Sequence, residues 1–128
     1  MLDHIGLSVS DYERSKRFYT ETLAPLGYKV VMEFGTTAGF GTEHPDFWIA
    51  EGEGASPIHV AFTSQDRAAV DAFHKAGLAA GGRDNGAPGL RTQYHPTYYG
   101  AFVFDPDGNN VEVVCHAPPS RGNVAQPS

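Results

Sequence analysis

The chain has little of what marks a secreted, membrane-spanning or nucleic-acid-binding protein. Its 128 residues include one cysteine, Cys115, so no internal disulfide framework can form and a reducing, cytoplasmic environment is expected. No apolar run approaches the roughly 18 residues of a membrane span. The N-terminus leads directly into a strand pattern, so no secretory signal peptide is expected. The 9 Lys and Arg against 15 Asp and Glu give a net charge of −6 without a basic run, which argues against nucleic-acid partners. Without a long apolar run, no membrane partner is expected either.

An internal repeat is the most informative feature that the sequence does contain. His4-Ile5-Gly6-Leu7-Ser8 returns 55 residues later as His59-Val60-Ala61-Phe62-Thr63. At the same offset four further identities occur, which are Asp11 with Asp66, Phe18 with Phe73, Leu23 with Leu78 and Gly27 with Gly82. The sequence therefore contains two copies of a strand that begins with a histidine and leads into a helix. Such a duplication predicts two similar modules whose strand histidines face one another across a pseudo-two-fold axis.

The local patterns place the other elements. Alternating apolar residues predict a strand over 2–9, and Ser10 with Glu13 predicts a capping box that starts a helix ending near Leu23. Three strands are expected near 28–34, 38–43 and 46–50, followed by a linker at 52–57. The second half is expected to contain a helix from Asp66 to near Gly77, a glycine-rich loop over 81–90 without a counterpart in the first half, and strands near 91–95, 99–105 and 110–115.

Strand parity indicates a metal site. His4 shares its strand face with Gly6 and Ser8, and His59 shares its face with Ala61 and Thr63, so small side chains lie beside each imidazole. Such a face predicts a cleft rather than a core. Glu112 projects opposite to its two valine neighbours, and a carboxylate is costly to bury there unless it is paired or bound to a metal. A lone strand histidine is usually a surface residue, but His4, His59 and Glu112 together suit a divalent ion with open coordination positions.

An aromatic cluster accompanies the glycine-rich segment. Tyr94, His95, Tyr98 and Tyr99 lie close together in the sequence, and two interpretations stay open. The cluster either packs against an edge strand or forms a wall of the substrate cleft. In the second case His95 or Tyr99 acts as acid, base or hydrogen-bond donor, and Tyr94 and Tyr98 line the pocket. Cys115 has the opposite parity to Glu112 and is expected in the core.

Both ends of the chain resemble the vicinal oxygen chelate superfamily. The resemblance rests on His-Ile-Gly-Leu-Ser-Val followed by Asp-x-x-x-Ser-x-x-Phe-Tyr, and on Phe-x-Asp-Pro-Asp-Gly-Asn-x-x-Glu ending at Glu112. It covers the chain from Leu2 to about His116. The superfamily includes glyoxalase I, extradiol dioxygenases, fosfomycin-resistance proteins, methylmalonyl-CoA epimerase and bleomycin-binding proteins. The motifs are therefore specific for the fold and weak for the reaction.

The resemblance implies an α+β fold of two paired βαβββ modules that form a partly open, barrel-like sheet. The chain is then a single glyoxalase-like domain over 1–128, with modules at about 1–52 and 57–116 and a disordered tail at about 117–128. The superfamily's ligand positions fall on His4, His59 and Glu112. Glyoxalase I carries a further glutamate on the last strand of its first module. Residues 46–50 hold no carboxylate or amide at that place, and Glu51 comes one to three residues late.

The resemblance also implies the function. We expect a divalent-metal-dependent enzyme acting on a small substrate with vicinal oxygens, with a lactoylglutathione lyase-like lyase or isomerase reaction. The alternatives are an extradiol ring-cleavage dioxygenase and a non-catalytic drug- or metabolite-binding resistance protein. The metal is Zn, Ni, Mn or Fe(II). Trp48 joins Tyr94 and Tyr98 in the expected pocket, and a homodimer is expected.

Overall fold

The computed structural model describes residues 1–53 and 56–119, and these fold into two βαβββ modules. The centre of the expected linker and the expected disordered tail beyond residue 119 lie outside the described residues. The elements are β1 (Ile5–Val9), α1 (Tyr12–Leu23), the 3-10 turn η1 (Ala24–Leu26), β2 (Lys29–Phe34), β3 (Thr37–Gly41), β4 (Phe47–Glu51), β5 (His59–Ser64), α2 (Arg67–Ala79), β6 (Arg83–Leu90), β7 (Tyr99–Phe104) and β8 (Asn110–Cys115). The expected α+β class is confirmed.

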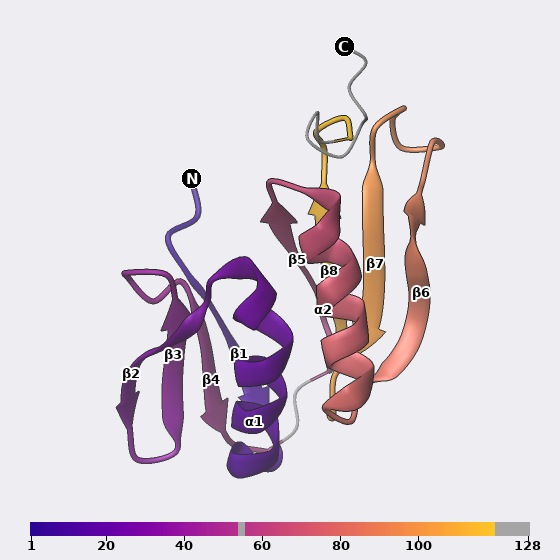
Figure 1. Cartoon of the computed structure of the whole chain (residues 1–128). Coiled ribbons are helices and arrows are strands. Elements are labelled where there is room, and N and C mark those ends of the chain that lie inside the picture. Colours follow the sequence, from indigo (N-terminus) through magenta and orange to yellow (C-terminus); the bar gives the residue numbers. More distant parts are fainter. Residues whose placement is uncertain (54–55, 120–128) are drawn as a thin grey trace.

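Each module contributes its own mixed sheet. The strand orders are β1-β4-β3-β2 and β5-β8-β7-β6, in which β1 pairs with β4 and β5 with β8 in parallel. Within the described residues no strand pairing joins the two sheets, so β1 and β5 each keep one unpaired edge. The helices α1 and α2 lie side by side over the two sheets (Figure 1). The arrangement is therefore an open one, as the resemblance implies.

The two helices begin in the same way, as the repeat requires. The Asp11 side chain accepts a hydrogen bond from the Arg14 backbone N–H, and Asp66 accepts one from the Ala69 N–H. The predicted capping box at Ser10 was wrong by one residue, because the Ser10 N–H instead donates to the Asp107 carboxylate. No helix of the described part is long and apolar enough to span a membrane.

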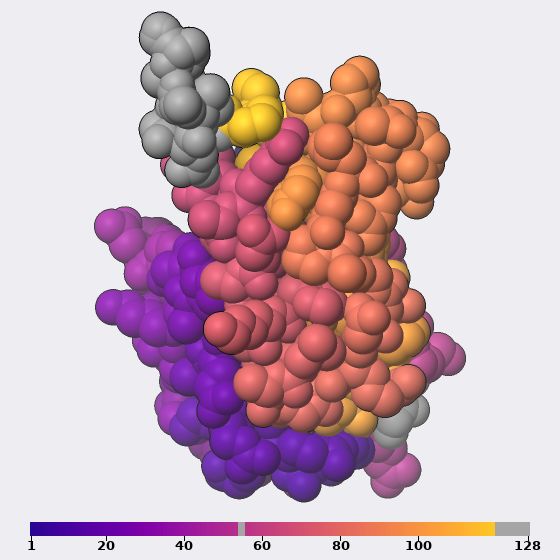
Figure 2. All heavy atoms as spheres, turned by 45° about the vertical axis from the view of Figure 1, so that its right-hand side comes forward, coloured from indigo at the N-terminus to yellow at the C-terminus, as the bar shows by residue number. Residues whose placement is uncertain are grey.

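One hydrophobic core runs through both modules. Phe47 of β4 and Phe62 of β5 are in edge contact, with ring centroids 5.3 Å apart. The buried hydroxyl of Tyr19, on α1, donates to Asp105 in the turn between β7 and β8. Figure 2 shows the indigo-to-purple first half abutting the pink-to-orange second half along a long boundary. The modules are thus positioned relative to each other by apolar packing and one buried polar contact.

The glycine-rich segment differs from its prediction. Residues 83–90 form strand β6, which pairs with β7 as β2 pairs with β3, so the segment does have a counterpart. Glycine is needed there because a Cβ on Gly86, whose φ is +153°, would lie 2.8 Å from the Phe102 ring. The predicted strand at 91–95 was wrong. Residues 91–98 are a turn, closed by a 2.7 Å hydrogen bond from Arg91 N to Tyr98 O, at the upper end of β6 and β7 in Figure 1.

Candidate metal centre

Glu112 on β8 is a buried carboxylate with two polar partners. Its side chain is 2% exposed. Oε1 lies 2.8 Å from Nε2 of His59, and Oε2 accepts a hydrogen bond from the hydroxyl of Tyr98. The three side chains come from β8, β5 and the 91–98 turn. The structure therefore brings two of the three predicted metal ligands into direct contact and adds a phenol to them.

The strand register explains why these groups meet. Glu112 lies beside Ala61 of β5 on one side and beside Phe102 of β7 on the other, so these side chains share one face. The small side chain of Ala61 leaves His59 room to reach back to the carboxylate. On β7, Gly100 also lies against the pair, and a Cβ there would be at contact distance, 3.5 Å from Glu112 Oε2 and 3.4 Å from the Tyr98 ring. Small residues thus lie next to the contact on both neighbouring strands.

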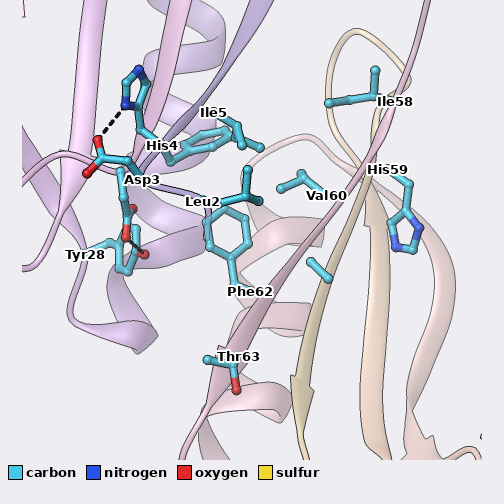
Figure 3. Close-up of a pocket in the computed structure, with 13 residues that line it drawn as sticks. Leu2, Asp3, His4, Ile5, Tyr28, Ile58, His59, Val60, Phe62 and Thr63 are labelled. Atoms are coloured by element: carbon cyan, nitrogen blue, oxygen red, sulfur yellow. Dashed lines mark hydrogen bonds and ion pairs between the residues drawn. The ribbon is translucent and has the colours of Figure 1, made fainter.

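His4 lies apart from this pair. It precedes β1, and its Nδ1 is 2.7 Å from the carboxylate of Asp3. His4 and His59 lie on opposite sides of a groove of about 540 Å³, and their imidazoles point away from each other (Figure 3). Over residues 1–53 and 56–119, no three His, Cys, Asp or Glu side chains gather closely enough to hold a metal ion. A third protein ligand therefore needs a movement of the N-terminal segment or a second chain.

Trp48 occupies the place that corresponds to Glu112 in the first module. Ile5 of β1 is opposite Phe47, and its repeat partner Val60 is opposite Val111. The next residue along each last strand is Trp48 in β4 and Glu112 in β8. The Glu51 carboxylate instead accepts a hydrogen bond of 2.9 Å from the Tyr12 N–H at the start of α1. The first module thus presents an indole where a second carboxylate ligand would lie.

Trp48 lies on the face of its own sheet that is opposite to the buried Phe47 and Ile49. A Cβ on Gly39 would lie 2.9 Å from the indole ring, so the glycine makes room for it. The ring centroid of Phe34 is 6.1 Å away, and Phe34 is 62% exposed. The first module therefore carries an apolar patch at the place that corresponds to Glu112 in the second.

Tyr98 and Tyr99 point to opposite sides of their sheet. Burial, followed by the hydrogen bond to Glu112, raises the pKa of the Tyr98 hydroxyl to about 12, so it carries its proton at neutral pH. The Tyr99 hydroxyl donates to Asp71 of α2 at 2.6 Å, and its ring lies under the guanidinium of Arg67. The hydroxyl beside the candidate ligands is therefore that of Tyr98. The alternation of side chains along the strand could have indicated this, because residues 98, 100 and 102 all lie on the face that carries Glu112.

The remaining members of the aromatic cluster surround Tyr98. The ring centroids of Tyr94 and His95 are 4.8 Å and 5.4 Å from that of Tyr98. His95 Nε2 is 2.6 Å from Nδ1 of His116, which follows β8. His95 thus contacts Tyr98, and Tyr98 in turn contacts Glu112. No local pattern of the sequence indicates that His116 meets His95.

The donor set of this site fits a divalent transition metal. A carboxylate and an imidazole nitrogen that converge on one point are ligands that zinc, nickel, manganese and iron accept. Glu112 is almost fully buried, and burial of a carboxylate is tolerated where it is hydrogen-bonded or bound to a cation. His59 is half-exposed, with 53% of its side chain accessible, so an ion has a path to the pair.

Comparison with known proteins identifies the fold. A structure described as a glyoxalase/bleomycin resistance protein from Albidiferax ferrireducens T118 is 29% identical, with a TM-score of 0.79, and the match covers 90% of this chain and 98% of that one. An E144Q mutant of glyoxalase I from Zea mays is 24% identical, with a TM-score of 0.69 over 88% of this chain and 46% of that one. The comparison with curated proteins gave no match.

A family model extends this result along the sequence. The model described as Glyoxalase/Bleomycin resistance protein/Dioxygenase superfamily matches residues 1–113, which include both modules through β7 and most of β8. The chain therefore belongs to the glyoxalase/bleomycin resistance protein/dioxygenase superfamily.

Proposed function

We propose that the protein is a divalent-metal-dependent isomerase or lyase that acts on a small substrate with two vicinal oxygens. The observation that carries the proposal is the buried Glu112 carboxylate, in contact with both His59 Nε2 and the Tyr98 hydroxyl. His59 and Glu112 would hold a Zn, Ni, Mn or Fe(II) ion, with His4 as the third ligand. When bound, such an ion supplies Lewis-acid stabilisation of negative charge on a substrate oxygen.

Tyr98 is the residue best suited to handle a proton. Its hydroxyl is protonated at neutral pH and already donates to a carboxylate. A substrate oxygen that becomes negatively charged would compete with Glu112 for this proton, so Tyr98 Oη is positioned to donate a hydrogen bond to it. His95 and Tyr94 hold the Tyr98 ring from the side.

Replacement of Tyr98 tests this role. Tyr98→Phe is expected to lower kcat by about 10²-fold because it removes one positioned donor and leaves both metal ligands. The assay uses hemithioacetals of α-keto aldehydes for isomerisation and catechols with an oxygen electrode for ring cleavage. Tyr99→Phe is the matched control and should retain turnover, since its hydroxyl contacts Asp71. Equal effects of the two substitutions would remove the proton-handling role from Tyr98.

An Fe(II) ring-cleavage dioxygenase is the second candidate. The indole of Trp48 at the place of a second carboxylate reduces the candidate ligands to His4, His59 and Glu112. Two histidines and one carboxylate are characteristic of non-haem Fe(II) oxygenases. Oxygen uptake with catechols would favour this reaction. Tight binding of either compound without turnover would instead indicate a binding protein.

We further propose that two chains assemble into a homodimer with two equivalent sites. Among the residues that the structure describes, β1 and β5 each have an unpaired edge beside the groove, and the apolar Leu2 and Ile58 on its lining are 84% and 43% exposed. Unpaired strand edges and exposed apolar side chains favour association. His4 from a second copy is then available to complete a site.

The expected mass in solution is accordingly twice the 13.8 kDa of one chain. Sedimentation equilibrium at micromolar concentration measures it. Leu2→Asp with Ile58→Asp should shift the mass towards that of a single chain, because charge is unfavourable in an apolar contact. A single-chain mass for the unmodified protein would contradict the assembly.

A further inference from the structure

Arg91 lies on the same open face as the candidate metal ligands. Its guanidinium carbon is 5.3 Å from the centre of the Phe102 ring, and His59 contacts that ring with a centroid distance of 6.3 Å. Phe102 is directly opposite Glu112 in the β7–β8 register. Arg91 Nη1 is also 3.3 Å from the carbonyl oxygen of Gly100, the residue that lies against Glu112 and Tyr98. The positive charge is therefore part of the face that carries the site.

The hydrogen bonds of Arg91 leave donors of its guanidinium available. Nη1 donates to the carbonyls of Gly89 and Gly100, and Nη2 donates to the carbonyl of Ala87. An arginine has five N–H donors, so these three bonds leave at least two of them available. Nε has no acceptor among the hydrogen bonds of the described residues. The available N–H groups of a guanidinium can donate to the oxygens of a carboxylate.

The charge of Arg91 also lacks an acidic partner. Among the ion pairs formed by residues 1–53 and 56–119, none includes Arg91. The nearest carboxylate of the site, on Glu112, is already in contact with His59 and Tyr98. Arg91 is half-buried, and a cation held in that position by neutral carbonyl groups retains much of its attraction for an anion.

We propose that Arg91 is an anion-binding residue of this site and that the substrate carries a carboxylate in addition to its vicinal oxygens. The proposal rests on the proposed function for the reacting end of the substrate, which would lie at His59 and Glu112. Arg91 would bind the carboxylate with its remaining N–H donors, beside the Phe102 ring. The protein would then select anionic substrates over neutral ones of the same shape, although its own net charge is −6.

Two probes that differ in charge alone test this selection. 3,4-Dihydroxybenzoate and 3,4-dihydroxybenzamide share the ring and the vicinal oxygens, and the benzoate alone is an anion. Calorimetric titration of the full chain is run with added Zn²⁺ and again with EDTA. The unmodified protein is expected to bind the benzoate at least about tenfold more tightly than the benzamide. Equal affinity for the two probes, or no binding of either, would overturn the proposal.

Variants locate the selection at Arg91. Arg91→Gln should bind both probes equally, and Arg91→Lys should retain part of the preference because it keeps the charge without the planar fork. Arg83→Gln is the matched control and should keep the full preference, since Arg83 begins strand β6, which Arg91 follows, and its guanidinium lies 4.8 Å from the Phe104 ring. A preference that persists in Arg91→Gln would overturn the assignment. If Arg91→Gln does not fold, the preference measured for the unmodified protein and for Arg91→Lys still tests the proposal.

The two titration conditions separate this proposal from the metal proposal. A carboxylate preference that is present in EDTA and unchanged by Zn²⁺ would support Arg91 while arguing against the metal site. Zn²⁺ binding without a carboxylate preference would support the metal site and argue against the role of Arg91.

Discussion

Replacing Glu112 by Gln is expected to lower the affinity for Zn²⁺ or Ni²⁺ at least about 100-fold, because the loss of a ligand exceeds the 10–100-fold effect of losing an outer partner. The substitution preserves the shape of the side chain and removes its negative charge. It also keeps an acceptor for the Tyr98 hydroxyl, so the fold should be maintained. His59→Ala is expected to reduce affinity comparably, since its Nε2 faces the same carboxylate at 2.8 Å. Isothermal titration of the metal-free protein measures both effects.

The chain contains a matched control for this experiment. His74 Nε2 and Asp84 Oδ1 are also 2.8 Å apart, but Asp84 is exposed, with 59% of its side chain accessible. Asp84→Asn should leave metal affinity within about twofold, as expected of a surface substitution that contributes no ligand. Retention of tight binding in Glu112→Gln and His59→Ala would contradict the site. His4→Ala reports separately on the third ligand, which lies apart in the single chain.

Replacing Asp105 by Ala is expected to lower the free energy of unfolding by about 3–5 kcal/mol, as for a buried ionic or hydrogen-bonded group that loses its partner. Asp105 is 3% exposed. It accepts hydrogen bonds from the Tyr19 hydroxyl, from Nδ2 and N of Asn109 at 2.9 and 2.8 Å, and from Asp107 N at 2.9 Å. Alanine would leave these buried donors without an acceptor.

Because Tyr19 belongs to α1 and Asp105 to the β7–β8 turn, the substitution also removes a contact between the modules. Urea unfolding followed by circular dichroism measures the free energy and shows whether one transition remains. Asp3→Ala, at a side chain that is 91% exposed, should change it by less than about 0.5 kcal/mol. A loss below about 1 kcal/mol in Asp105→Ala would show that the turn tolerates the cavity and the unpaired donors.

Much of the site was predictable because strand parity leaves few choices. The alternation along 59–63 and 111–113 places His59 and Glu112 on one face, and the structure confirms their contact. The position of His4 was not predictable in this way, since it depends on how two sheets without shared hydrogen bonds pack against each other. That packing is set by distant contacts such as Phe47 with Phe62, which no local pattern encodes.

Strand β6 was not predicted from the sequence because of its glycines. Gly86 and Gly89 make residues 81–90 look like a loop, because glycine is ordinarily unfavourable in strands. Here the absence of a Cβ allows β6 to approach Phe102 and the Arg91 side chain closely, so the strand forms because of its glycines. The structure places the hydroxyl of Tyr98, rather than that of Tyr99, beside Glu112, because the Tyr99 hydroxyl donates to Asp71 of α2.

Anomalous diffraction at the zinc edge, from crystals of the full chain grown with Zn²⁺, is the most direct test of the metal centre. One strong peak per chain is expected at about 2.0–2.2 Å from both His59 Nε2 and a Glu112 carboxylate oxygen. The same map identifies the third ligand as His4 of that chain or of a second copy. A peak only at other histidines, such as the His74–Asp84 pair, or no peak at saturating Zn²⁺, would contradict the metal centre.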